Sequence, residues 1–117
     1  MLKKGGPSRV VLVTCATAAE ARRIARTVVG KKLAACVNIV LSPVESLYTW
    51  KGKVERAREY LLVMKTSAKR IVSLENEVKR LHSYDVPEFI TLPITEGSKK
   101  YLSWLNESVA RADKNCR

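Results

Sequence analysis

The chain of 117 residues has little cysteine, a single histidine, a single phenylalanine and no long apolar run. No apolar stretch approaches the roughly 20 residues that cross a bilayer, and the opening Met-Leu-Lys-Lys-Gly-Gly-Pro lacks the apolar centre of a secretory signal. Three cysteines cannot all pair within one chain, which favours free thiols in a reducing compartment. We therefore expect a soluble, cytoplasmic protein with one domain.

The motifs of common catalytic machineries are also absent. The sequence contains no Gly-x-Ser-x-Gly, no glycine-rich phosphate loop, no Cys-x-x-Cys and no second histidine to act as a base beside a nucleophile. We expect a protein that is not an enzyme.

Acidic residues are scarce. The chain has 11 acidic and 22 basic residues, which gives a formal net charge of +11. Such an excess can attract nucleic acid, an anionic membrane or acidic small molecules, or can simply form a solvated surface. The strands of a ferredoxin-like RNA-binding module carry stacking aromatics, which are missing from the runs at 10–13 and 61–64. We therefore expect neither a nucleic-acid partner nor a membrane partner.

Apolar periodicity predicts the order of the elements. Thr17-Ala18-Ala19-Glu20 has the form of a capping box and predicts a helix from Ala18 to Gly30. Ser67 and Ser98 are candidate N-caps for two later helices, the first ending near His82 and the second near 109. Strands are expected at 9–15, 33–41, 44–50, 54–66 and 86–94.

The predicted order, βαβ followed by βαβ and a terminal helix, is that of an α+β ferredoxin-like sandwich with a four-stranded antiparallel sheet and two helices on one face. Residues 9–110 form the predicted domain. The breaker cluster Gly-Gly-Pro indicates a flexible lead-in at 1–8, and the polar residues at 111–117 indicate a flexible tail.

Four residues are candidate metal ligands. His82 ends a predicted helix, where it could cap carbonyl groups or bind copper, zinc or nickel together with Cys15 or Glu88. Cys15 is the last residue of the first predicted strand and is either an activated thiolate or a small, inert core residue. Cys36 is either a core or interface residue or a metal ligand, whereas Cys116 reads as an exposed thiol in the tail.

Two aromatic pairs could each form a cluster. Tyr48 and Trp50 share one face of a strand, and Tyr101 and Trp104 share one side of a helix. Both pairs are open to two interpretations, which are packing in the core or at a subunit interface, and stacking on a ligand.

The order and spacing of several motifs resemble the CutA family of divalent-cation tolerance proteins over nearly the whole chain, from Val10 to Leu105. The matching segments are Thr14-Cys15, Lys32-Leu33-Ala34-Ala35-Cys36-Val37-Asn38, Ser46-Leu47-Tyr48-Thr49-Trp50-Lys51-Gly52-Lys53, Glu59, Lys65-Thr66, His82-Ser83-Tyr84 and Pro87-Glu88. The resemblance implies a homotrimer of ferredoxin-like subunits whose strands extend one another's sheets, with 41–50 as the interlocking segment.

The resemblance also implies a function. It points to metal binding, with copper or zinc held at His82, Cys15 and Cys36, and no required cofactor. The alternative that it implies is a PII-like signalling module that binds an anionic small molecule in a cleft between subunits. The cleft candidates are Tyr48, Trp50, Glu59, Lys65, Tyr84, Glu88 and Trp104.

Overall fold

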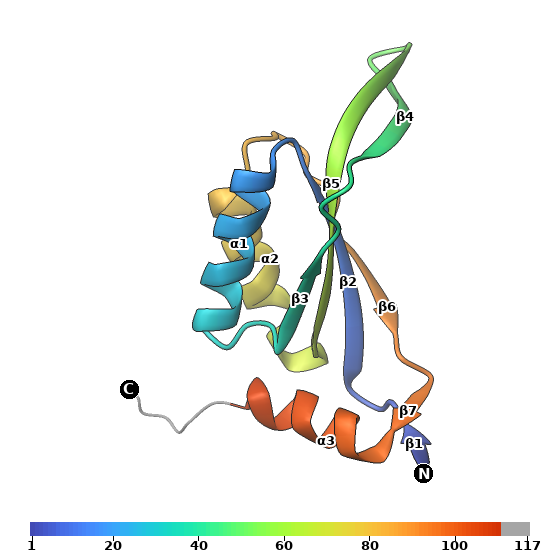
Figure 1. The fold of residues 1–117 in the computed structure, drawn as a ribbon, viewed down its shortest axis with the longest axis vertical. Helices are drawn as coiled ribbons and strands as arrows, with labels where there is room; N and C mark the ends of the chain where they lie inside the picture. Colours follow the sequence, from blue (N-terminus) through green and yellow to red (C-terminus); the bar gives the residue numbers. More distant parts are fainter. Residues whose placement is uncertain (111–117) are drawn as a thin grey trace.

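The computed structural model describes residues 1–110, and the predicted tail at 111–117 lies outside the described residues (Figure 1). The strands are β1 (Leu2–Lys4), β2 (Ser8–Cys15), β3 (Cys36–Ile39), β4 (Val44–Trp50), β5 (Lys53–Ser67), β6 (Ile90–Pro93) and β7 (Glu96–Ser98). The helices are α1 (Ala18–Gly30), α2 (Ile71–Leu81) and α3 (Lys99–Ser108), and a 3₁₀ turn, η1 (Ala68–Arg70), leads into α2. Within residues 1–110, the helices are too short and too polar to cross a membrane.

The long strand β5 organises the main sheet. Its second half pairs antiparallel with both β2 and β3, β6 adds to the other edge of β2, and the order β3-β5-β2-β6 results. This order, with α1 and α2 on one face, is the predicted ferredoxin-like α+β arrangement (Figure 1). Apolar side chains of these two helices and of the facing strands form the core: Val11, Val13, Ala21, Ile24, Val28, Leu62, Met64, Leu74 and Val78.

Two strands are shorter than predicted. β3 begins at Cys36 rather than at 33, because the N–H groups of Leu33 and Ala34 both donate to Val28 O at the exit of α1. β6 begins at Ile90 rather than at 86, because its pairing with β2 begins at Ile90, which lies opposite Leu12.

The predicted flexible lead-in at 1–8 is wrong, since Leu2–Lys4 form β1. This strand pairs antiparallel with β7, from almost the other end of the chain, and the two make a small separate sheet beside α3 (Figure 1). Residue 5 has to be glycine because the backbone passes very close to Ile94 there. Gly5 N–H donates to Thr95 O at 2.9 Å, and a Cβ at this position would lie 1.6 Å from Ile94 O.

Strands β4 and β5 form a hairpin that projects beyond the body of the molecule (Figure 1). Lys51 and Gly52 both have positive φ at its turn, 53° and 80°, as a two-residue type I′ turn requires. The base of the hairpin is the part that contributes to the site described next.

Candidate functional site

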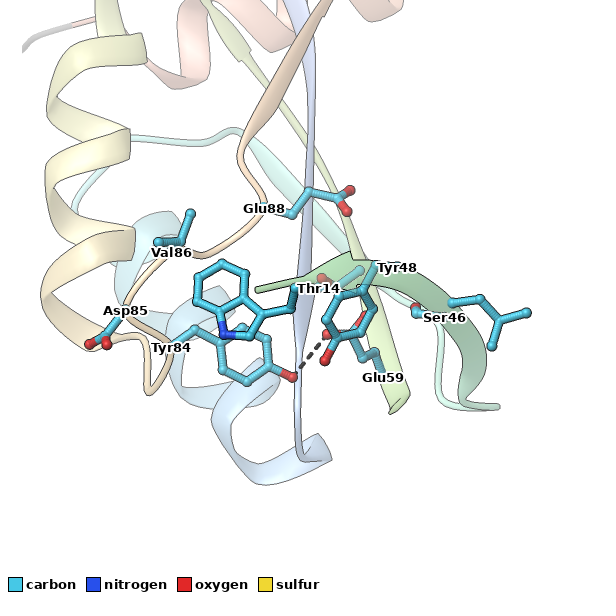
Figure 2. A pocket seen from close by; sticks show the side chains of 10 residues that line it. Thr14, Ser46, Tyr48, Glu59, Tyr84, Asp85, Val86 and Glu88 are labelled. Atoms are coloured by element: carbon cyan, nitrogen blue, oxygen red, sulfur yellow. Dashed lines mark hydrogen bonds between the residues drawn. The ribbon is translucent and has the colours of Figure 1, made fainter. Parts of the chain in front are cut away.

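A cleft opens where the hairpin, the end of β2 and the loop 82–88 meet (Figure 2). Its volume of about 560 Å³ is of the size that holds a small organic ligand. Three aromatic residues, three acidic residues and four others line it: Tyr48, Trp50, Tyr84, Glu59, Asp85, Glu88, Thr14, Ser46, Leu47 and Val86.

Glu59 is the buried acid of this cleft, with 7% of the residue exposed. Tyr84 Oη donates a hydrogen bond of 2.9 Å to Glu59 Oε2, drawn as a dashed line in Figure 2. Burial first, and then this bond and the charge of Glu59, raise the pKa of Tyr84 well above its ordinary value. Tyr84 therefore remains a hydrogen-bond donor to Glu59 across the physiological pH range.

The charge of the cleft is negative and uncompensated. In the part of the chain that the structure describes, its lining includes no Lys or Arg, and no basic side chain lies within ion-pair distance of Glu59. Partial burial, followed by the negative charge of Glu59, raises the pKa of Glu88. Because a buried charged group is normally paired, the buried carboxylate of Glu59 is the group here that a positively charged ligand would compensate.

His82 lies next to the cleft, but both of its ring nitrogens are engaged. Its side chain is fully buried, Nε2 lies 2.8 Å from Thr14 O, and Nδ1 lies 3.1 Å from the N–H of Tyr84, which donates to it. A neutral imidazole with its proton on Nε2 satisfies both contacts. The ring therefore positions the loop and presents no free lone pair to a metal ion in this arrangement.

Glu20 fastens the same loop to the start of α1. Its carboxylate accepts hydrogen bonds from Ser83 N–H at 2.6 Å and from Ser83 Oγ at 3.1 Å, and it lies 3.7 Å from His82 Nδ1. Thr17 Oγ1 accepts from Glu20 N–H at 3.1 Å, so this half of the predicted capping box is confirmed. The Glu20 carboxylate binds the distant loop instead of completing the box.

Cys15 is completely buried at the end of β2. Burial, followed by the negative charges of Glu20 and Glu59, raises the pKa of its thiol from 9.0 to about 12. The thiol therefore stays protonated at neutral pH, which favours the inert core residue over the activated thiolate of the two interpretations.

We expect Cys15 to resist alkylation by iodoacetamide in the folded protein, whereas the partly exposed Cys36 reacts. A Cys116→Ser background removes the third thiol, and peptide mass spectrometry measures each rate. Because the folded state raises this pKa, the contribution of Cys15 to stability is complete below pH 9.0 and is lost as the pH rises toward about 12. Equal labelling of the two thiols under native conditions would contradict this assignment.

Cys36 belongs to a second cluster, outside the cleft. Lys65 faces Cys36 across the β3–β5 pair, hydrogen-bonds to Asn38 Oδ1 and lies 4.0 Å from Cys36 Sγ. Burial and then the neighbouring Cys36 raise the pKa of Tyr101, whose ring centroid is 5.5 Å from that of Trp104. The structure thus brings together Cys36, Lys65 and Trp104, which the sequence had assigned to two different sites.

Comparison with known proteins supplies the family. The family described as CutA1 divalent ion tolerance protein matches residues 9–108. The chain belongs to this family. It is 46% identical over 99 residues to the divalent-cation tolerance protein CutA of Thermus thermophilus, which covers 85% of this chain and 95% of that protein. It is 49% identical over 102 residues to the chloroplastic protein CutA of Arabidopsis thaliana.

The coverage of the plant relatives is partial. The matched region is 87% of this chain but 56% of the Arabidopsis thaliana protein, and 57% of the chloroplastic protein CutA 1 of Oryza sativa. Solved structures of CutA1 proteins share the fold. The one from Thermus thermophilus has a TM-score of 0.86 at 45% identity over 88% of this chain and 99% of that chain. The one from Oryza sativa has a TM-score of 0.86 at 46% identity over 92% and 97%.

The cleft candidates that the CutA resemblance implied divide between the cleft and the cluster around Cys36. Five of these candidates line the cleft, namely Tyr48, Trp50, Glu59, Tyr84 and Glu88. The other two, Lys65 and Trp104, do not line it. Sequence reasoning missed five lining residues: Thr14, Ser46, Leu47, Asp85 and Val86. The alternation of a strand could have found Ser46, because it shares a face with Tyr48 and Trp50.

The candidate metal ligands do not converge. Glu88 lines the cleft, His82 and Cys15 are buried and do not line it, and Cys36 belongs to the cluster of Lys65. Over residues 1–110, no group of three or more His, Cys, Asp or Glu side chains is placed to hold an ion.

Proposed function

We propose that this chain acts in divalent-cation tolerance by binding a cation at the carboxylates of the cleft, without catalysing a reaction. The observation that carries the proposal is Glu59, a carboxylate that is 7% exposed, lines the cleft and has only a phenol as its hydrogen-bond partner among the described residues. A cation beside it would supply the missing positive charge, and Glu88 at the same cleft adds a second negative group.

The donor atoms define which cations suit the cleft. Carboxylate and phenol oxygens favour hard divalent ions that keep part of their water shell, while imidazole and thiolate would favour zinc or copper. The nitrogen atoms of His82 are already engaged, so copper or zinc at His82 and the thiols would require the loop 82–88 to rearrange. We accordingly place the cation at Glu59 and Glu88, with water completing its coordination.

Glu59→Gln is expected to weaken the binding of Mn²⁺ about tenfold, because it removes a charge but keeps an acceptor for Tyr84 Oη. Isothermal titration calorimetry measures the affinities. The raised pKa of Glu88 means that this carboxylate protonates at a higher pH than an ordinary Glu, so affinity falls earlier on acidification.

Glu107→Gln is the matched control, because Glu107 is exposed on α3 and away from the cleft. Identical isotherms for the wild type and Glu59→Gln would sink the proposal. A loss of affinity in both variants would assign the effect to overall charge.

We also propose that the protein is a homotrimer. The hairpin projects from the subunit, one edge of β4 has no partner strand within residues 1–110, and Val54 on the hairpin is 78% exposed. Exposed strand edges with apolar side chains are normally covered by another chain. Native mass spectrometry should give three times the mass of one chain, and Val54→Asp should shift the population to smaller species.

Val72→Asp provides the control for this prediction, since Val72 is 71% exposed on α2, away from the hairpin. A wild-type protein that stays monomeric at micromolar concentration would refute the trimer.

The alternative of a PII-like module with an anionic ligand has less support. Its proposed recognition residue, Lys65, is engaged with Asn38 outside the cleft, and the described lining of the cleft carries three acids and no base. An anion placed there would meet like charges, which is unfavourable.

A further inference from the structure

The aromatic walls of the cleft come from two separate elements. Tyr48 and Trp50 alternate along β4 and share one face of the hairpin, while Tyr84 approaches from the loop 82–88. Figure 2 shows Tyr84 pointing toward Glu59, with which it hydrogen-bonds. The buried carboxylate therefore shares one cleft with aromatic side chains that belong to different parts of the chain.

A metal ion does not account for these rings. Ions such as Mn²⁺ take oxygen, nitrogen or sulfur donors, so an indole and the faces of two phenols add nothing to their coordination. The residues described here also include no group of three or more ligating side chains, and a space of about 560 Å³ exceeds what one ion needs. The size and the lining both suit an organic molecule.

The charge of that molecule follows from the acids. The chain as a whole carries a formal charge of +11, yet the described lining of this cleft has three acidic residues and no basic one. A neutral or anionic ligand would leave Glu59 buried without a positive partner. A cationic nitrogen would pair with it, and aromatic faces attract ammonium groups through their electron density.

We propose that the cleft binds an organic ammonium ion, whose nitrogen pairs with Glu59 and whose carbon atoms pack on the rings of Tyr48, Trp50 and Tyr84. The inference goes beyond the proposed function, because it uses the same carboxylate, Glu59, for an organic cation rather than a metal ion. Glu88 at the same cleft offers a second anionic group, so a short diamine suits the site better than a monoamine.

Calorimetric titration of the full chain tests the proposal with putrescine and tetramethylammonium as probes and butanediol as the neutral equivalent of the diamine. Glu59→Gln removes the charge, and Tyr48→Leu removes an aromatic face at a residue that is 45% exposed, so folding is not at risk. Trp104→Leu is the control, since Trp104 is similarly exposed but outside the cleft. Mn²⁺ is also titrated into the wild type and into each of the three variants.

The expected result is binding of putrescine that falls about tenfold in both cleft variants and is unchanged in Trp104→Leu. Equal binding of putrescine and butanediol, or an unchanged affinity in Tyr48→Leu, would overturn the proposal. Binding of Mn²⁺ that depends on Glu59, without binding of either amine, would overturn the inference and leave the proposed function standing. Absence of both kinds of binding would overturn the two together.

Discussion

Glu20→Ala is expected to lower the free energy of unfolding by about 1–3 kcal/mol, because it leaves two donors of the loop without their charged acceptor. Glu20 accepts from both the N–H and the hydroxyl of Ser83 at 2.6 and 3.1 Å, and it is 6% exposed. Urea unfolding measures the change. The loop 82–88 should also exchange its amide hydrogens faster, since it loses its attachment to α1.

The effect should extend to the cleft. Tyr84 and Glu88 both belong to the loop that Glu20 holds, so Glu20→Ala should weaken cation binding although Glu20 does not line the cleft. Glu20→Gln keeps one acceptor oxygen and should lose less stability, and the exposed Glu107→Ala should change neither property. Wild-type exchange rates at Ser83 and Tyr84 in Glu20→Ala would argue against this role.

Gly5→Ala is the second substitution with a large expected effect, a loss of about 1–3 kcal/mol in the free energy of unfolding. The added Cβ would lie 1.6 Å from the backbone oxygen of Ile94, so the backbone must move rather than a side chain. That movement would break the 2.9 Å bond from Gly5 N–H to Thr95 O and separate β1 from β7.

Gly30→Ala is the matched control. A Cβ at Gly30 would meet no atom within 4 Å, and Gly30 is the last residue of α1, where alanine favours the helix, so stability should be unchanged or rise slightly. Hydrogen exchange at residues 2–4 distinguishes a local from a global effect. If Gly5→Ala unfolds at the same urea concentration as the wild type, the close contact with Ile94 does not exist in solution.

Much of the fold was predictable because its signals are local. The Thr17 cap and the apolar stripe of α1 lie within a few turns of chain, and Lys51-Gly52 marks a two-residue turn by itself. β1 was missed because its three residues form a strand only against β7, whose position depends on the whole intervening domain. The start of β3 was misplaced because the N–H groups of Leu33 and Ala34 donate to Val28 O near the end of α1.

The site shows the same division. Strand alternation puts Tyr48 and Trp50 on one face, and a loop that contains Tyr84 and Glu88 follows α2. Nothing local indicated that Glu59 would be buried beside Tyr84, or that Lys65 would turn toward Asn38 and Cys36. These outcomes depend on how far β5 extends past β2 and β3, and on which segments pack against each of its faces.

The sequence by itself determined the family, the element order and the types of residue available to a site, because these follow from motifs and from periodicities of two and 3.6 residues. Only the tertiary structure decided what those residues can do. It occupied both nitrogens of His82, buried the thiol of Cys15 and set Glu59 against a cleft without a described basic partner. The physical reason is that hydrogen-bond saturation, desolvation and charge pairing depend on neighbours in space, which in this chain come from segments far apart in sequence.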